Sequence, residues 1–297
     1  MEYVIETRQL VKKFPNKLAV DHVDIHVQKG DIYGLIGKNG AGKTTSMKIM
    51  LGMLKATSGE VLLFNNTNLK EERRRIGSLI EAPGLYKNAT AYENMKRFSY
   101  ISGGTDEDIK DILELVGLAD VPNRKVNAYS LGMKQRLGIA VALLGNPELL
   151  ILDEPINGLD PAGIKEVRDL IIKLNKERGV SFIISSHLLD ELGKIATRYG
   201  IINNGALVDE ISSEELLDKC KKSLVIHSDN IAKAKEVLTK EKILDQYSES
   251  GNALTLFDHV EESAKINTLL VKAGINVSEI RINNSSIEDY FIERLGK

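Results

Sequence analysis

The stretch IYGLIGKNGAGKT, Ile32–Thr44, decides the fold of this chain of 297 residues. Its second part, GKNGAGKT at Gly37–Thr44, matches the pattern G-x-x-x-x-G-K-[ST] of a phosphate-binding loop. An apolar strand precedes this loop and a helix-forming segment follows it, which is the context that such a loop requires. Glycines let successive backbone N–H groups curve around phosphate oxygens, and the start of a helix adds partial positive charge. The sequence therefore predicts a nucleotide-binding loop between a strand and a helix.

Two side chains of this loop carry specific roles in the prediction. Lys43 is a point charge for the β- and γ-phosphates of a nucleotide, and the Thr44 hydroxyl is expected to ligate Mg²⁺. The cofactors implied are ATP and Mg²⁺. The candidate nucleotide contacts of the loop are Gly37, Lys38, Asn39, Gly40, Ala41, Gly42, Lys43, Thr44 and Thr45.

A second chemical element is LLILDEP, Leu149–Pro155, in which an apolar strand ends on two carboxylates. A carboxylate at the end of a buried strand is costly unless it is paired or bound to a metal, so Asp153 is expected to hold Mg²⁺. Glu154 follows directly, and on an extended chain it points to the opposite side. It is expected to face the attacking water as general base.

Strands alternate with helices along the first two thirds of the chain. This alternation predicts a mainly parallel sheet with helices around it. The expected strands are 3–7, 23–27, 32–36, 76–80, 149–152 and 181–185; the expected helices are 43–53, 91–101, 106–116, a segment from Ser130, and 161–178 with Asp160 as its N-cap.

The composition changes near Cys220. From Leu224 the pattern predicts strand, helix (229–240), strand, strand (253–257), helix (260–273), strand (277–282) and helix (286–295). Asp258 with Glu261, and Ser285 with Glu288, have the spacing of reciprocal N-terminal caps. We therefore expect two domains: residues 1–220, which should fold and bind ATP alone, and a small α+β domain of residues 221–297.

The segment YSLGMKQR, Tyr129–Arg136, stands shortly upstream of LLILDEP and resembles the signature segment of ATP-binding cassette (ABC) ATPases. The resemblance covers about residues 1–220, with the motifs in the family's order. It implies the α/β fold of a P-loop NTPase of the ABC type: a mainly parallel sheet core, antiparallel strands and a helical signature subdomain. It also implies ATP hydrolysis in a homodimer, because in this family each signature caps the γ-phosphate held by a second subunit.

Further site residues follow from the resemblance alone. Phe14 is similar to the aromatic that stacks on adenine, and His187 to the histidine that contacts the γ-phosphate and takes part in catalysis with Lys43 and Glu154. Ser130 and Gly132 match the signature positions that cap the phosphate. Asp160 belongs to NGLD, Asn157–Asp160, which looks like the loop that crosses the dimer interface.

Two departures from the family pattern are present. The signature reads YSLGM where the family commonly has LSGGQ, so Leu131 replaces a glycine and Met133 a glutamine. Where the family commonly places a glutamine that reaches Mg²⁺ and touches the membrane partner, this chain has Glu81, a further candidate metal ligand.

EAPGLY at 81–86, the signature and the C-terminal extension together resemble the ATPases of bacterial bacitracin and lantibiotic exporters. The resemblance implies a peptide antibiotic as cargo and separate transmembrane permease subunits as partners. Three alternatives stay open: an ATPase of a general exporter for a drug, an ion or a polysaccharide; a non-transport ABC ATPase; and a binding module without catalysis.

Charge and hydropathy restrict the partners and the place of action. A net charge of -2 gives no global attraction to nucleic acid, so none is expected as a partner. No apolar run approaches the roughly 20 residues that span a bilayer, and the N-terminus is not a secretory signal. With a permease as partner, the expected location is the cytoplasmic face of the cell membrane.

Overall fold

The computed structural model describes residues 2–283 and 286–296. The chain divides into two compact units, one of Met1–Ser213 with Phe291–Lys297 and one of Glu214–Tyr290. The first division lies close to the boundary expected at residue 220. The return of the C-terminal residues to the first unit is a feature that the sequence did not predict.

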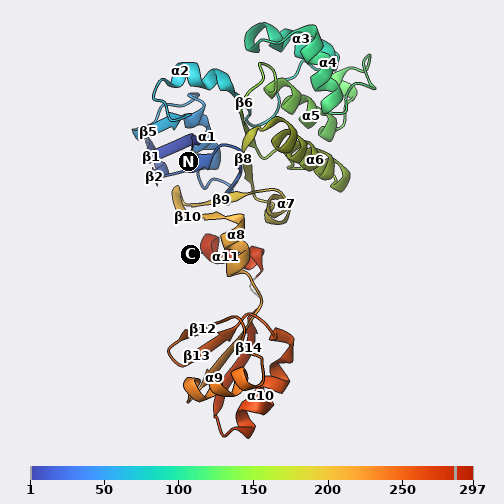
Figure 1. Ribbon diagram of the computed structural model, residues 1–297. Helices are drawn as coiled ribbons and strands as arrows, with labels where there is room; N and C mark the ends of the chain where they lie inside the picture. The colour runs from blue at the N-terminus through green and yellow to red at the C-terminus, as the bar shows by residue number, and fades with distance from the viewer. Residues whose placement is uncertain (1, 284–285, 297) are drawn as a thin grey trace. The chain divides into compact units, whose positions relative to one another are not determined.

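An antiparallel sheet opens the first unit, with β2, β3 and β5 all paired to β1. Strands β1, β2 and β5 lie together in Figure 1. The strands are β1 (Tyr3–Phe14), β2 (Lys17–Val23), β3 (His26–Gln28) and β5 (Ser58–Leu63). The single strand expected at 23–27 is wrong, because the chain leaves β2 at Val23 and enters β3 at His26. Buried Thr7 explains the break: its hydroxyl donates to the Val23 carbonyl and accepts from the Ile25 N–H, both at 2.8 Å.

A second sheet has the strand order β10-β9-β4-β8-β7-β6 and is parallel except for the β10–β9 pair. Its strands are β4 (Ile32–Ile36), β6 (Ile76–Leu79), β7 (Leu149–Asp153), β8 (Ser181–Ser186), β9 (Arg198–Asn203) and β10 (Ala206–Ser212). Every residue of β4, β7 and β8 is buried, as expected for the centre of a parallel sheet covered on both faces. The mainly parallel core is confirmed.

Helices cover this core. Met47 and Met50 of α1 are fully buried in a cluster that contains residues of both sheets. The helices of the first unit are α1 (Lys43–Met50), α2 (Leu69–Glu72), α3 (Ala91–Ser102), α4 (Asp106–Leu115), α5 (Leu131–Ala142), α6 (Pro161–Arg178) and α7 (Leu189–Gly193). α3, α4 and α5 lie together as a helical group (Figure 1). The expected cap of α6 is confirmed, since Asp160 Oδ1 accepts from the Gly163 N–H at 2.9 Å.

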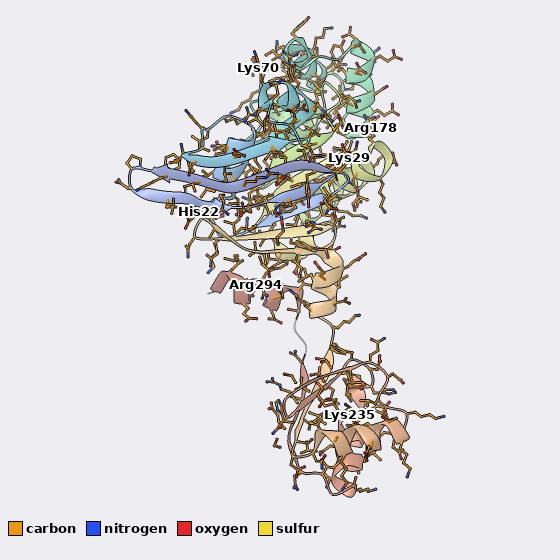
Figure 2. The ribbon with its side chains drawn as sticks, turned by 60° about the vertical axis from the view of Figure 1, so that its left-hand side comes forward. His22, Lys29, Lys70, Arg178, Lys235 and Arg294 are labelled. Carbon is orange, nitrogen blue, oxygen red and sulfur yellow. The ribbon has the colours of Figure 1, made fainter. Side chains whose placement is uncertain are left out.

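The last residues of α11 (Ile287–Gly296) complete the first unit. Phe291 is fully buried, and its ring centroid lies 5.4 Å from that of Tyr199 on β9. Arg294, labelled in Figure 2, donates through Nε to Asp209 on β10 at 2.5 Å. An aromatic contact and an ion pair therefore hold the C-terminal turns against the sheet.

The second unit has its own apolar core under an antiparallel sheet of order β12-β13-β11-β14. Its elements are α8 (Ser213–Lys219, whose first residue belongs to the first unit), β11 (Ser223–Ser228), α9 (Ile231–Lys240), β12 (Tyr247–Ser250), β13 (Ala253–Leu256), α10 (Ser263–Lys272) and β14 (Val277–Asn283). Chain order from β11 to β14 is β-α-β-β-α-β, the ferredoxin-like arrangement. The small α+β fold expected here is the one observed.

One of the two helix caps predicted for this unit is wrong, and the other cannot be compared with the structure. The cap expected from Asp258 and Glu261 is wrong: a short 3₁₀ turn, Val260–Glu262, precedes α10, and His259 Nδ1 pairs with Glu262 Oε1 at 2.8 Å. The pair Ser285 and Glu288 lies outside the described residues, because Ser285 is not among them.

Candidate functional site

The phosphate-binding loop joins β4, in the middle of the parallel sheet, to α1. Gly40 and Gly42 have φ of 78° and 117°, in the left-handed region that favours glycine. A Cβ on Gly42 would lie 2.5 Å from the Ala19 carbonyl oxygen, so no other residue fits there without moving the backbone. The loop therefore turns tightly into the N-terminus of α1, where backbone N–H groups can bind an anion.

Lys43 is buried, with only 6% of the residue exposed. Its ammonium donates to the Gly37 carbonyl at 2.6 Å and lies 3.5 Å from Glu154 Oε1. A buried ammonium needs such acceptors, because removal from water is costly for a charge. These contacts hold the charge beside the loop.

Asp153 ends β7 beside Ser185 of β8. The Thr44 hydroxyl donates to Asp153 Oδ2 at 2.8 Å, and the Ser185 hydroxyl donates to Oδ1 at 2.5 Å. The structure thus brings together the two residues expected to share a metal, and adds Ser185, which the sequence did not predict. Hydroxyl and carboxylate oxygens are ligands that suit Mg²⁺, which takes its other ligands from water and phosphate. No cluster of three or more metal-ligating side chains occurs in the described part of the chain.

Glu154 differs from its prediction in backbone conformation. It is not extended: its φ is 49°, in the left-handed region, at a cost of roughly 1–3 kcal/mol for a non-glycine residue. Its N–H donates to Ser185 Oγ at 2.9 Å, and its carboxylate meets His187 Nδ1 at 2.8 Å. The strained turn therefore brings the carboxylate to both His187 and Lys43.

A cavity of about 330 Å³ opens over the loop. Its lining consists of Phe14, Lys17, Ala19, Lys38–Thr45 and Glu154. Phe14 is 38% exposed, and Lys12 Nζ lies 5.2 Å from its ring centroid. Lys17, which the sequence did not predict, donates to the Gly40 carbonyl at 2.9 Å. An aromatic wall and a phosphate cradle thus share one cavity, as a nucleotide requires.

The signature residues lie outside the lining of this cavity. Ser130 is the N-cap of α5 and accepts from the Met133 N–H at 3.2 Å, while Gly132 lies in the first turn. Leu131, the departure from the family pattern, is 52% exposed.

Glu81 has its own partner. Lys48 of α1 donates to Glu81 Oε1 at 2.6 Å, and this contact holds the pKa of the carboxyl below its usual value. Glu81 also has φ of 63° and lines, with Lys48, a second cavity of about 370 Å³. The sequence did not predict Lys48 as its partner.

The described residues include no helix long and apolar enough to cross a bilayer.

A family described as "ABC transporter" matches residues 20–157. The bacitracin transport ATP-binding protein BcrA of Bacillus licheniformis is 43% identical over 301 residues, which cover 100% of this chain and 98% of that protein. The lantibiotic transport ATP-binding protein SrtF of Streptococcus pyogenes is 44% identical over 207 residues, 70% of this chain and 90% of that protein.

Solved structures of ATP-binding cassettes are similar in fold to this chain. The ATP-binding cassette MJ0796, a dimer in a post-hydrolysis state bound to ADP and Pi, has a TM-score of 0.63 at 26% identity, covering 70% of this chain and 98% of that one. The cassette MJ1267 in its ADP conformation has a TM-score of 0.67 at 28% identity, covering 74% and 94%. The chain therefore belongs to the ABC transporter family, as an ATP-binding and ATP-hydrolysing subunit.

Proposed function

We propose that this chain powers an exporter that removes a peptide antibiotic of the bacitracin or lantibiotic type. The observation that carries the proposal is the likeness to a bacitracin transport protein over the whole chain, the second unit included. The match to a lantibiotic transport protein covers 70% of the chain and supports the same class of cargo.

In the proposed mechanism, Lys43 and the loop N–H groups bind the β- and γ-phosphates of ATP, and Phe14 stacks on the adenine. Thr44 and Asp153 would hold Mg²⁺, which would neutralise phosphate charge, and Glu81 is a further candidate ligand. The Glu154 carboxylate accepts a proton from the attacking water. His187 Nδ1 is engaged by Glu154 at 2.8 Å, which leaves Nε2 to contact the γ-phosphate.

We further propose that two copies close around two nucleotides. Ser130 and Gly132 at the start of α5 cap the γ-phosphate of the partner copy, because backbone N–H groups at a helix start bind anions. Asp160, at the start of α6, belongs to the loop that crosses between copies. The partners are transmembrane permease subunits, and the place of action is the cytoplasmic face of the cell membrane.

Growth of cells on the antibiotic tests the proposal. A sensitive strain is given this chain together with its proposed transmembrane permease subunits, and inhibitory concentrations of bacitracin and of a lantibiotic are measured. The matched control carries Lys43→Ala in place of the parent chain. Protection that requires Lys43 supports the proposal. An active ATPase that protects against neither peptide, or only against an unrelated drug, contradicts the assignment of cargo.

Replacing Glu81 with glutamine should change ATP hydrolysis by the isolated protein by less than about tenfold, roughly 1.4 kcal/mol in the barrier. Both side chains offer an oxygen to Mg²⁺ and to Lys48, whose ammonium lies 2.6 Å from the carboxylate. Antibiotic protection should fall further than hydrolysis, because the loop also contacts the permease. Phosphate release and growth are measured on the same variant. A thousandfold loss of hydrolysis would instead make Glu81 catalytic.

A further inference from the structure

Strand β14 lies at one edge of the second unit's sheet. Among the described residues it pairs with β11 alone. Within residues 2–283 and 286–296, no strand lies beside the backbone groups of Ser278–Ile282 that point away from β11. Most side chains of β14 are exposed. An edge of this kind is a template for pairing with another strand.

The charges on β14 alternate in a simple way. Glu279 and Arg281 lie on the same face of the strand, with side chains 48% and 63% exposed, and Arg281 Nε lies 3.4 Å from Glu279 Oε1. Ile280 stands between them on the other face, in line with Ile226 of β11. Ile282, two residues further, is 39% exposed. The strand thus presents one acid, one base and partly exposed apolar side chains.

The positions of Glu279 and Arg281 make the charges of one copy of β14 complementary to those of a second, antiparallel copy. When two copies of β14 run antiparallel with Ile280 opposite Ile280, Glu279 of each copy lies opposite Arg281 of the other. A shift of the register by two residues places Glu279 opposite Glu279, or Arg281 opposite Arg281. Opposite charges that face each other across strands stabilise a pair, and like charges destabilise it. The charges therefore select the register centred on Ile280.

We propose that the second unit forms a homodimer by pairing β14 with β14 of a second copy, antiparallel and centred on Ile280. The pairing has a two-fold axis and uses the same surface on both copies. It continues the sheet across the interface and keeps α9 and α10 of both copies on one face. It needs no nucleotide, which separates it from the ATP-bound dimer proposed above.

A single strand edge buries little surface, so this contact is weak alone. The competing interpretation is that the charges of β14 protect a monomeric edge against pairing. The two interpretations predict different behaviour without nucleotide.

Sedimentation equilibrium of the nucleotide-free full chain, over a concentration series, distinguishes them. We expect a monomer–dimer equilibrium whose dissociation constant rises about tenfold or more in Glu279→Arg and in Arg281→Glu, since each variant opposes like charges twice. The double variant Glu279→Arg with Arg281→Glu should restore the parent value. An equimolar mixture of the two single variants should form heterodimers.

Lys240→Glu, at the end of α9, is the matched charge reversal and should leave the dimer unchanged. Cysteine crosslinking supplies an independent measurement in a Cys220→Ser background, which removes the one native thiol. Ile280→Cys should form a disulfide between the two copies, because position 280 of one copy lies opposite position 280 of the other. Glu279→Cys should form none, because position 279 lies opposite Arg281. A chain that stays monomeric at all concentrations and gives no crosslink at position 280 would overturn the proposal. A dimer that is indifferent to all the charge variants would do the same.

Discussion

Replacing Glu154 with glutamine is expected to lower ATP turnover by about 10²–10⁴-fold, the range typical of losing a general base, while ATP still binds. The amide keeps the shape of the side chain and can still hydrogen-bond to His187, 2.8 Å away in the parent, but it cannot accept the proton of the attacking water. Phosphate release at saturating ATP measures turnover, and titration with a fluorescent nucleotide measures binding.

The stalled Glu154→Gln protein should also accumulate as an ATP-bound dimer in size-exclusion chromatography with MgATP. Glu148→Gln is the matched control. Glu148 lies just before the first residue of β7, at the opposite end of the strand from Glu154, and it pairs with Arg75 at 2.8 Å. That variant should hydrolyse ATP at about the parent rate. Hydrolysis by Glu154→Gln near the parent rate would show that another group takes the proton.

Replacing Lys43 with alanine should raise the dissociation constant for ATP by about 10- to 100-fold, since a hydrogen bond to a charged group contributes about 1.5–3 kcal/mol. The cavity loses the ammonium beside the loop, and the Gly37 carbonyl loses a donor at 2.6 Å. The fold should survive, because the charge serves the ligand. Nucleotide titration and circular dichroism separate the two effects.

Lys70→Ala, at an exposed position on α2, is the control for Lys43→Ala and should leave the affinity for ATP unchanged. Unchanged affinity in Lys43→Ala itself would contradict the assignment of the phosphate-binding loop. Loss of helical signal would show instead that Lys43 is needed to fold the site.

The sequence predicted correctly those elements whose ends are set by neighbouring residues. α6 begins and ends at the predicted residues, because Asp160 caps its start, Pro161 suits its first position and Gly179 takes the left-handed conformation after it. The strand expected at 23–27 failed because Thr7, distant in the sequence, bonds to the Val23 carbonyl and the Ile25 N–H. A window of neighbouring residues contains no sign of that contact.

The same distinction between neighbouring and distant residues applies to the candidate site. Motif spacing pointed to Thr44 and Asp153, whose side chains the structure places 2.8 Å apart. Lys17, Lys48 and Ser185 escaped prediction because each is defined by a partner 23 to 33 residues away. The turn at Glu154 escaped because its φ of 49° is a conformation that a glutamate rarely adopts.

The burial of Phe291 against Tyr199 has a consequence for biosynthesis. A ribosome releases the chain from its N-terminus, and domains generally fold as they emerge. The ATPase unit includes residues 291–297, so it cannot reach its final packing until these residues have been translated and have left the ribosome. The second unit, Glu214–Tyr290, is fully translated before residues 291–297. It can therefore fold while the first unit, to which both of its ends are connected, is still incompletely packed. A product truncated before residue 291 would therefore have an incompletely packed ATPase unit. Its Tyr199 side chain would lack the Phe291 ring, and such a chain is a suitable substrate for the cell's proteases.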